Sequence, residues 1–154
     1  MDWTFHEGEL DCVDVCALLA QHVAAMNAGS PPSACHVLAA EALADPAIRL
    51  FTVRDEVGGL LGCGALKRLA ADHGEIKSMR TGDAALGRGV GSRVLDHLIA
   101  TARATGITRL SLETGNGEQF AAANRLYEQA GYERCGPFGN YITTPYTRFL
   151  TKTL

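Results

Sequence analysis

Apolar positions along this chain recur with two different periods, and each change of period marks a new element. Over residues 13–26 the period is near 3.6, which predicts an amphipathic helix. The residues on its apolar face are Val15, Leu18, Leu19, His22 and Val23. A second helix is expected over Ala34–Ala44, between a capping Ser33 and the Asp-Pro pair at 45–46. A short strand is expected before both, over Trp3–His6.

Residues 48–81 change to a strand-like pattern. The run "IRLFTVRDEVGGLLGCGALKRL" predicts two strands joined by a turn near residues 56–59, which makes an antiparallel hairpin. The segment "HGEIKSMRT" (73–81) is a third candidate strand, with Ile76 expected on one face and Met79 on the other.

Beyond Val90 the helical period returns, with Gly106 where a helix-ending glycine is expected. Its apolar stripe is Val94, Leu95, Leu98, Ile99 and Ala102. Then "ITRLSLETG" predicts a strand, "FAAANRLYEQAG" a helix ending at Gly131, and the tail two further short strands. This order predicts one α/β domain over residues 1–154, with a mixed, mostly antiparallel sheet flanked by about four helices.

The composition and net charge limit the classes of partner that are expected for this chain. The chain has 154 residues, 47% of them apolar and 20% charged, with a net charge of −3, so neither nucleic acid nor an anionic membrane is an expected partner. No apolar run approaches the roughly 20 residues that span a bilayer. The acidic start "MDWTFHEGELD" is unlike a signal peptide, so we expect a cytoplasmic protein. The sequence does not distinguish a monomer from a homodimer.

The five cysteines are scattered and form no C-x-x-C pair. Buried small side chains in a reducing compartment account for them better than a zinc site or a disulfide framework. The five histidines lack the H-E-x-x-H spacing, so no metal is expected.

The segment "LGRGVGS" (86–92) places glycine at every second position directly before a helix. A helix N-terminus leaves several N–H groups unpaired, and glycines let a phosphate approach them closely. Arg88 would add a full positive charge. A tight strand-to-helix turn that merely needs glycine explains the loop equally well. The lysine of a Walker loop is missing, and Ser92 takes the place of the third glycine of a dinucleotide fingerprint.

The loop resembles motif A of the GNAT superfamily of acyl-CoA-dependent N-acyltransferases, [RQ]-x-x-G-x-[GA]. Gly89 and Gly91 match its last two positions, whereas Leu86 stands where Arg or Gln is usual. Together, "GEIKSMRT", "RLSLETG" and "RLYEQAGYERCGPFGNY" resemble a subgroup of small single-domain acetyltransferases with an E-I-K-x-M-R-T strand, over roughly residues 48 to 154.

The resemblance implies acetyl-CoA as co-substrate, with its pantetheine arm along the strand of Ser78–Thr81 and the Met79 N–H on the thioester carbonyl. The residues implied in cofactor binding are Met79, Arg80, Thr81, Gly87, Arg88, Gly89, Val90, Gly91 and Ser92. An asparagine common in the family is replaced here by Phe120.

Two catalytic residues are implied or suggested. Tyr127 matches the family tyrosine that protonates the departing thiolate, although it also fits as a packed aromatic of an amphipathic helix. Glu75 is the candidate general base, directly or through water, or else a solvated strand glutamate; Glu113 is a second candidate. Arg80 and Lys77 could bind an acceptor carboxylate or be solvated charges.

The sequence therefore predicts a cytoplasmic N-acetyltransferase acting on a primary amine of a small molecule or peptide. A non-catalytic acyl-CoA-binding sensor is the alternative, and a nucleotide-binding protein a third. The acceptor pocket is expected from the N-terminal helices, near His36, and from the loop "GPFGNYITTPY".

Overall fold

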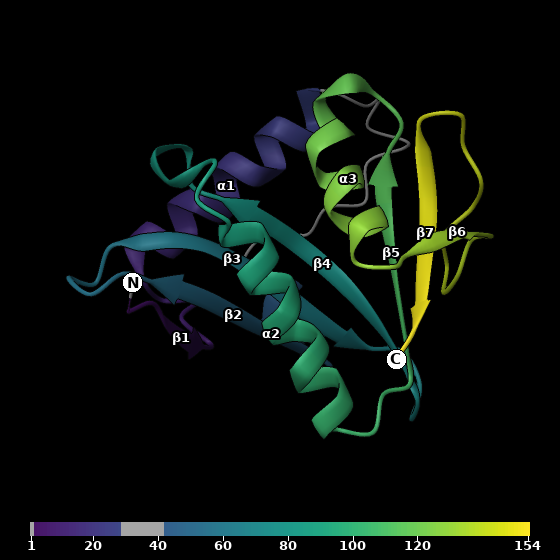
Figure 1. The fold of residues 1–154 in the computed structure, drawn as a ribbon, viewed down its shortest axis with the longest axis horizontal. Coiled ribbons are helices and arrows are strands. Elements are labelled where there is room, and N and C mark those ends of the chain that lie inside the picture. The colour runs from purple at the N-terminus through teal and green to yellow at the C-terminus, as the bar shows by residue number, and fades with distance from the viewer. Residues whose placement is uncertain (1, 29–41) are drawn as a thin grey trace.

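One mixed sheet of seven strands runs through the protein, in the order β1-β2-β3-β4-β5-β7-β6 (Figure 1). The computed structural model describes residues 2–28 and 42–154. The strands are β1 (Thr4–Glu7), β2 (Ile48–Arg54), β3 (Leu60–Arg68), β4 (His73–Thr81), β5 (Arg109–Gly115), β6 (Glu133–Cys135) and β7 (Thr147–Thr153). The α-helices among the described residues are α1 (Val13–Ala28), α2 (Val90–Ala104) and α3 (Ala121–Gln129). Short 3₁₀ turns lie at Ala42–Ala44, Asp83–Ala85 and Glu118–Phe120.

The order of elements agrees with the sequence prediction. β2 and β3 form the predicted antiparallel hairpin, and β4 covers the same residues as the predicted third strand. All strand pairs are antiparallel except β4 with β5, which gives the mixed, mostly antiparallel sheet. The helix predicted over Ala34–Ala44 lies outside the described residues, apart from its last turn.

The helices cover opposite faces of the sheet. α2 and α3 pack on one face, the near one in Figure 1, where the predicted stripe of α2 is fully buried beside Ile76, Leu110 and Leu112. α1 packs on the other face, where Val15 and Leu19 contact the cluster that contains Cys63. The two faces therefore carry separate apolar cores, one for each helical layer.

One prediction about β4 is wrong. Met79 packs against the same core cluster as Ile76, although strict alternation would place the two on opposite faces. The register explains this, because Cys63 pairs with Arg80 while Ala65 pairs with Lys77. One residue of β3 thus faces two of β4, which is a β-bulge, and the extra residue reverses the alternation beyond it.

Candidate active site

β4 and β5 are joined at one end and part at the other. Their parallel pairing covers only His73–Glu75 with Arg109–Ser111. Beyond Glu75, β4 therefore has one edge without a strand neighbour, and its main-chain groups there can bond to a ligand. The bulge lies on this open stretch, and Ser78 has a φ of 54°, the one positive φ of a non-glycine residue among those described. Such strain is typical of functional sites.

The glycine loop leads into α2 with the geometry of an anion site. Gly87 and Gly89 have φ of 77° and 84°, and a Cβ added at either would meet no atom within 4 Å. Gly89 caps α2, and the first helical bond runs from the Arg93 N–H to its carbonyl at 3.1 Å. The N–H groups of Val90, Gly91 and Ser92 precede that bond and so have no acceptor within the helix. This loop offers both space and donors to a phosphate.

Two other residues of the loop have contacts within the protein. A Cβ at Gly91 would lie 3.3 Å from Cδ2 of Leu126, so this glycine also lets α2 approach α3. The Arg88 guanidinium lies over the indole ring of Trp3 at 5.6 Å, and that of Arg93 lies over the same ring at 5.2 Å. The role of Arg88 toward a phosphate stays a prediction.

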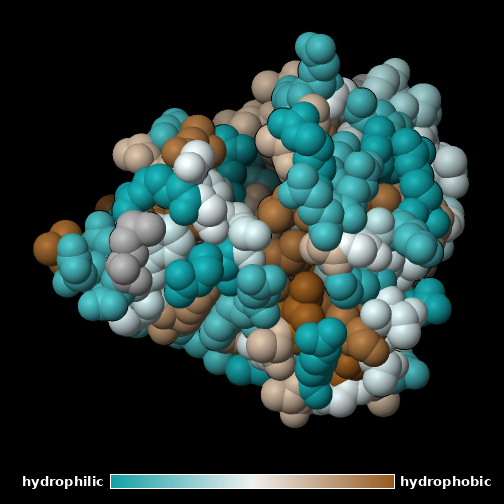
Figure 2. All heavy atoms as spheres, viewed as in Figure 1, coloured by the Kyte–Doolittle hydropathy of each residue, from teal (hydrophilic) through white to brown (hydrophobic). Residues whose placement is uncertain are grey.

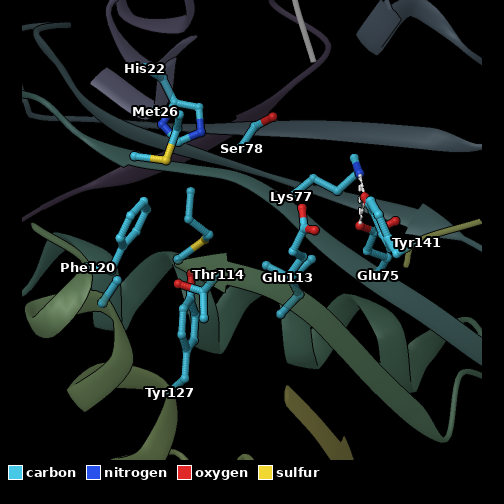
Figure 3. Close-up of a pocket in the computed structure, with 13 residues that line it drawn as sticks. His22, Met26, Glu75, Lys77, Ser78, Glu113, Thr114, Phe120, Tyr127 and Tyr141 are labelled. Carbon is cyan, nitrogen blue, oxygen red and sulfur yellow. Dashed lines mark hydrogen bonds and ion pairs between the residues drawn. The ribbon is translucent and has the colours of Figure 1, made fainter. Parts of the chain in front are cut away.

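Two cavities meet beside β4. The first, of about 110 Å³, lies between α1, β4, β5 and α3. Its lining residues, drawn in Figure 3, are His22, Met26, Glu75, Ile76, Lys77, Ser78, Met79, Glu113, Thr114, Phe120, Ala123, Tyr127 and Tyr141. The second, of about 320 Å³, extends toward the glycine loop and includes Arg80, Thr81 and Gly91. Both cavities share Met26, Met79, Phe120, Ala123 and Tyr127. The two cavities are therefore adjacent, and Figure 2 shows this face hollowed beside α3.

Tyr127 stands where the cavities meet. Its side chain is 6% exposed and contacts the Tyr132 ring edge-on, with 5.9 Å between ring centroids. Burial raises the pKa of the Tyr127 phenol above its usual value near 10, so the phenol stays protonated at neutral pH. The residue therefore combines the packing expected of the helix face with a proton available at the cavity.

Glu75 is buried, at 3% exposure, so the alternative of a solvated strand glutamate is wrong. Its Oε2 accepts hydrogen bonds from Lys77 Nζ at 2.8 Å and from the Tyr141 hydroxyl at 2.6 Å (Figure 3). Lys77 Nζ also donates to the Tyr141 oxygen at 2.7 Å. Burial first, and then the Glu75 carboxylate, raise the pKa of Tyr141. The structure thus places a Glu–Lys–Tyr cluster at one end of the first cavity.

Sequence reasoning missed several cavity residues. The sequence pattern places His22 only on the apolar stripe of α1, and Tyr141 only in a loop expected to shape the acceptor pocket. The predicted second candidate for the base, Glu113, points from β5 into the same cavity (Figure 3). His36 lies outside the described residues.

No group of three or more His, Cys, Asp or Glu side chains that could hold a metal occurs in residues 2–28 and 42–154. No helix in this part of the chain is long and apolar enough to cross a membrane.

Residues 19–132 match the model of the Acetyltransferase (GNAT) family. The chain belongs to this family. It is 44% identical to the uncharacterized N-acetyltransferase YsnE of Bacillus subtilis over 140 residues, which cover 91% of this chain and 92% of YsnE. It is 41% identical to the uncharacterized N-acetyltransferase YedL of Escherichia coli over 152 residues, which cover 99% of this chain and 95% of YedL.

A solved GNAT family acetyltransferase from Elizabethkingia anophelis, which has acetyl-CoA bound, has the same fold. The TM-score is 0.71 at 17% identity, over 99% of this chain and 98% of that one. GNAT acetyltransferases use acetyl-CoA, and the spacious loop, the free helix N-terminus and the open edge of β4 in this chain suit such a molecule.

Proposed function

We propose that this protein transfers the acetyl group of acetyl-CoA directly to a primary amine of a small molecule or peptide, as a single cytoplasmic domain. The observation that carries the proposal is the position of Met79 and Tyr127, which line both cavities. Cofactor and acceptor can therefore enter from opposite sides and meet at these two residues.

The main chain supplies most of the cofactor site. The loop N–H groups at Val90, Gly91 and Ser92 would hold phosphate, with space provided by Gly87 and Gly89. The open edge of β4 at Met79–Thr81 would bond to the pantetheine arm, as an added strand does. Bound acetyl-CoA supplies the acetyl group as a thioester, whose sulfur departs as a thiolate.

Two side chains would move the protons. Glu75 takes a proton from the acceptor ammonium, directly or through water, so that the amine nitrogen can attack. As the new C–N bond forms and the C–S bond breaks, Tyr127 would give its phenolic proton to the sulfur, and the Met79 N–H would donate to the carbonyl oxygen as it gains negative charge. The surplus proton on the newly acylated nitrogen would return to the Tyr127 phenolate through solvent, which leaves a neutral amide and a protonated tyrosine. Glu113 is the second candidate for the base, because it faces the same cavity.

No covalent enzyme intermediate is needed. Cys63, on β3 beside the site, is 1% exposed, and burial raises the pKa of its thiol to about 12, which keeps it protonated and a poor nucleophile.

The test is a screen of primary amines with acetyl-CoA, with CoA release and the mass of the acetylated product as readouts. We expect at least one amine to give a product in which an acetyl group has replaced one N–H hydrogen, and Tyr127→Phe to lower its formation. Tight acetyl-CoA binding without turnover across the panel would instead identify a sensor, and preference for ATP or NAD over CoA would identify a nucleotide-binding protein.

A further inference from the structure

Two side chains on the α1 face of β4 carry hydrogen-bonding groups without partners. His22 of α1 is 6% exposed, and its Nδ1 is buried with no hydrogen bond within residues 2–28 and 42–154. Arg80 of β4 is partly buried, and its Nε is likewise buried without a partner in the same described ranges. Buried polar atoms are satisfied in most native proteins, so a pair of orphaned ones beside a cavity points to a ligand.

Arg80 forms no ion pair with any acidic side chain in residues 2–28 and 42–154. Asp83, which lines the second cavity with Arg80, accepts a hydrogen bond from Gln21 at 2.8 Å, and Glu75, on the same strand as Arg80, binds Lys77 and Tyr141. Lys77, the other cation considered for a carboxylate, is held in the Glu–Lys–Tyr cluster. The structure thus separates two cations that the sequence could not distinguish.

His22 adds a hydrogen-bond donor beside Arg80 without adding a second positive charge. Burial first, and then the positive charge of Arg80, lower the pKa of His22 to about 4. The imidazole is therefore neutral at pH 7, and it offers one N–H donor without adding a second charge. A guanidinium beside a neutral donor is a suitable site for one carboxylate, which Arg binds through two parallel hydrogen bonds.

The position of this pair favours the acceptor over the cofactor. The glycine loop opens α2, which covers one face of the sheet, whereas His22 belongs to α1 on the opposite face. His22 lines the first cavity and Arg80 the second, so the pair lies where the two meet. A carboxylate bound there would leave the rest of the same molecule within the first cavity.

We propose that Arg80 and His22 bind a carboxylate of the acceptor, so that the acceptors are amines that also carry a carboxylate, such as amino acids. This inference rests on the proposed acetyl transfer and names its substrate class. The first cavity, of about 110 Å³, adjoins this pair and would hold the rest of the acceptor.

The experiment compares matched acceptors that differ at the carboxylate: a panel of L-amino acids and the corresponding L-amino acid amides, with each kcat/KM expressed per unprotonated amine because the amide also lowers the pKa of the amine. We expect the wild-type kcat/KM for the preferred amino acid to exceed that for its amide by roughly 10- to 100-fold, the range of a charge-assisted hydrogen-bond pair. Arg80→Gln should abolish this preference, mainly by raising the KM for the acid. Arg80→Lys should restore part of it, and His22→Gln should cause a smaller loss.

Binding measurements separate the sources of the anion. Calorimetry with acetyl-CoA alone should give the same affinity for the wild type and Arg80→Gln, within a few-fold, because the pantetheine arm would bond to the main chain of β4, which the substitution keeps. A loss of acetyl-CoA affinity in Arg80→Gln, with equal losses for acid and amide, would overturn the inference and assign Arg80 to a cofactor phosphate. Arg134→Gln, which removes an exposed charge on β6, is the matched control, and melting temperatures check that each variant folds.

The outcomes also separate this inference from the proposed function. If the wild type acetylates amides as well as acids, or only amines without a carboxylate, the carboxylate site is wrong while acetyl transfer stands. If it acetylates no amine but binds acetyl-CoA, the proposed function fails, and the inference fails with it.

Discussion

Glu75 and Tyr141 are joined by a hydrogen bond of 2.6 Å, although 66 residues separate them. The bond ties the middle of the sheet to the connection between β6 and β7 and fixes one wall of the first cavity. Lys77 completes the cluster, and its Nζ also lies 5.5 Å from the centre of the Tyr141 ring. The candidate base is therefore held in one orientation before any acceptor arrives, which favours catalysis by positioning.

Glu75→Gln should lower the rate of acetylation mainly near and below neutral pH, by roughly 100-fold. The reason is that a base is needed most while the amine is protonated, and the deficit should shrink as the pH rises toward the pKa of the amine. A pH–rate profile for kcat/KM measures this, with the exposed Glu118→Gln as control. A profile superimposable on that of the wild type would exclude Glu75, and Glu113→Gln would then be tested in the same way.

Tyr141→Phe should have a smaller effect than Glu75→Gln. It removes the hydroxyl that donates to Glu75 but keeps the ring, which contacts Phe138 and Phe149. We expect a rate loss below about tenfold at neutral pH, because a single oriented hydrogen bond contributes about 1 kcal/mol. A loss equal to that of Glu75→Gln would assign the proton transfer to the tyrosine itself.

Tyr127→Phe should reduce kcat by roughly 100-fold while the affinity for acetyl-CoA changes little. Only the hydroxyl is lost, so the ring keeps its contact with Tyr132 and the melting temperature should hardly change. Single-turnover kinetics isolate the chemical step. Wild-type kcat under these conditions would reduce Tyr127 to a packing role, and a large fall in melting temperature would attribute the lost rate to lost structure.

Gly89→Asp should weaken acetyl-CoA binding by at least about tenfold more than Gly89→Asn. Asp and Asn have nearly the same shape, and both tolerate a positive φ better than most residues, so the comparison isolates the negative charge beside the α2 N-terminus. Calorimetry at two salt concentrations measures the difference, which should narrow at high salt. Leu86→Ala, at a position 63% exposed, is the control expected to bind normally. Equal affinities for the Asp and Asn variants would refute the anion site.

His22 predicts a loss of stability on acidification. Its pKa is lowered from 6.5 to about 4 in the folded protein, so the unfolded chain binds a proton first as the pH falls from about 6.5 to 4. Protonation therefore favours unfolding, by up to about 3 kcal/mol. Urea unfolding at pH 7 and pH 4.5 should show a smaller pH effect in His22→Gln than in the wild type. NMR titration of the His22 ring gives its pKa directly, and an ordinary value near 6.5 would contradict the prediction.

Much of the fold could be predicted because its local patterns are strong. The stripe of α2 is buried as its period indicates, and Gly106 and Gly131 both have the positive φ expected after a helix. The hairpin of β2 and β3 followed from the turn residues between them. These features depend on neighbouring residues, so the sequence pattern contains them.

The site was less predictable because it depends on distant residues and on register. The contact of Tyr141 with Glu75 requires the folding of a loop 66 residues away, and no local pattern records it. The side on which Met79 lies depends on one bulged residue opposite Gly64, which a short strand of mixed polarity does not show. The sequence also could not show that Arg80 is available to a ligand while Lys77 is bound within the protein, because this depends on their partners in the folded structure.

The open edge of β4 also bears on how this protein can acquire new substrates. Along that edge the strand can hydrogen-bond the acyl donor through its main-chain N–H and C=O groups, which every residue except proline has. Its side chains, Arg80 among them, project from the faces of the sheet and are available to address the other ligand. A substitution of a side chain on β4 can therefore change which amine is accepted without removing the main-chain hydrogen bonds to the acyl donor. Acceptor specificity and donor binding can thus change independently, although one strand contributes to both.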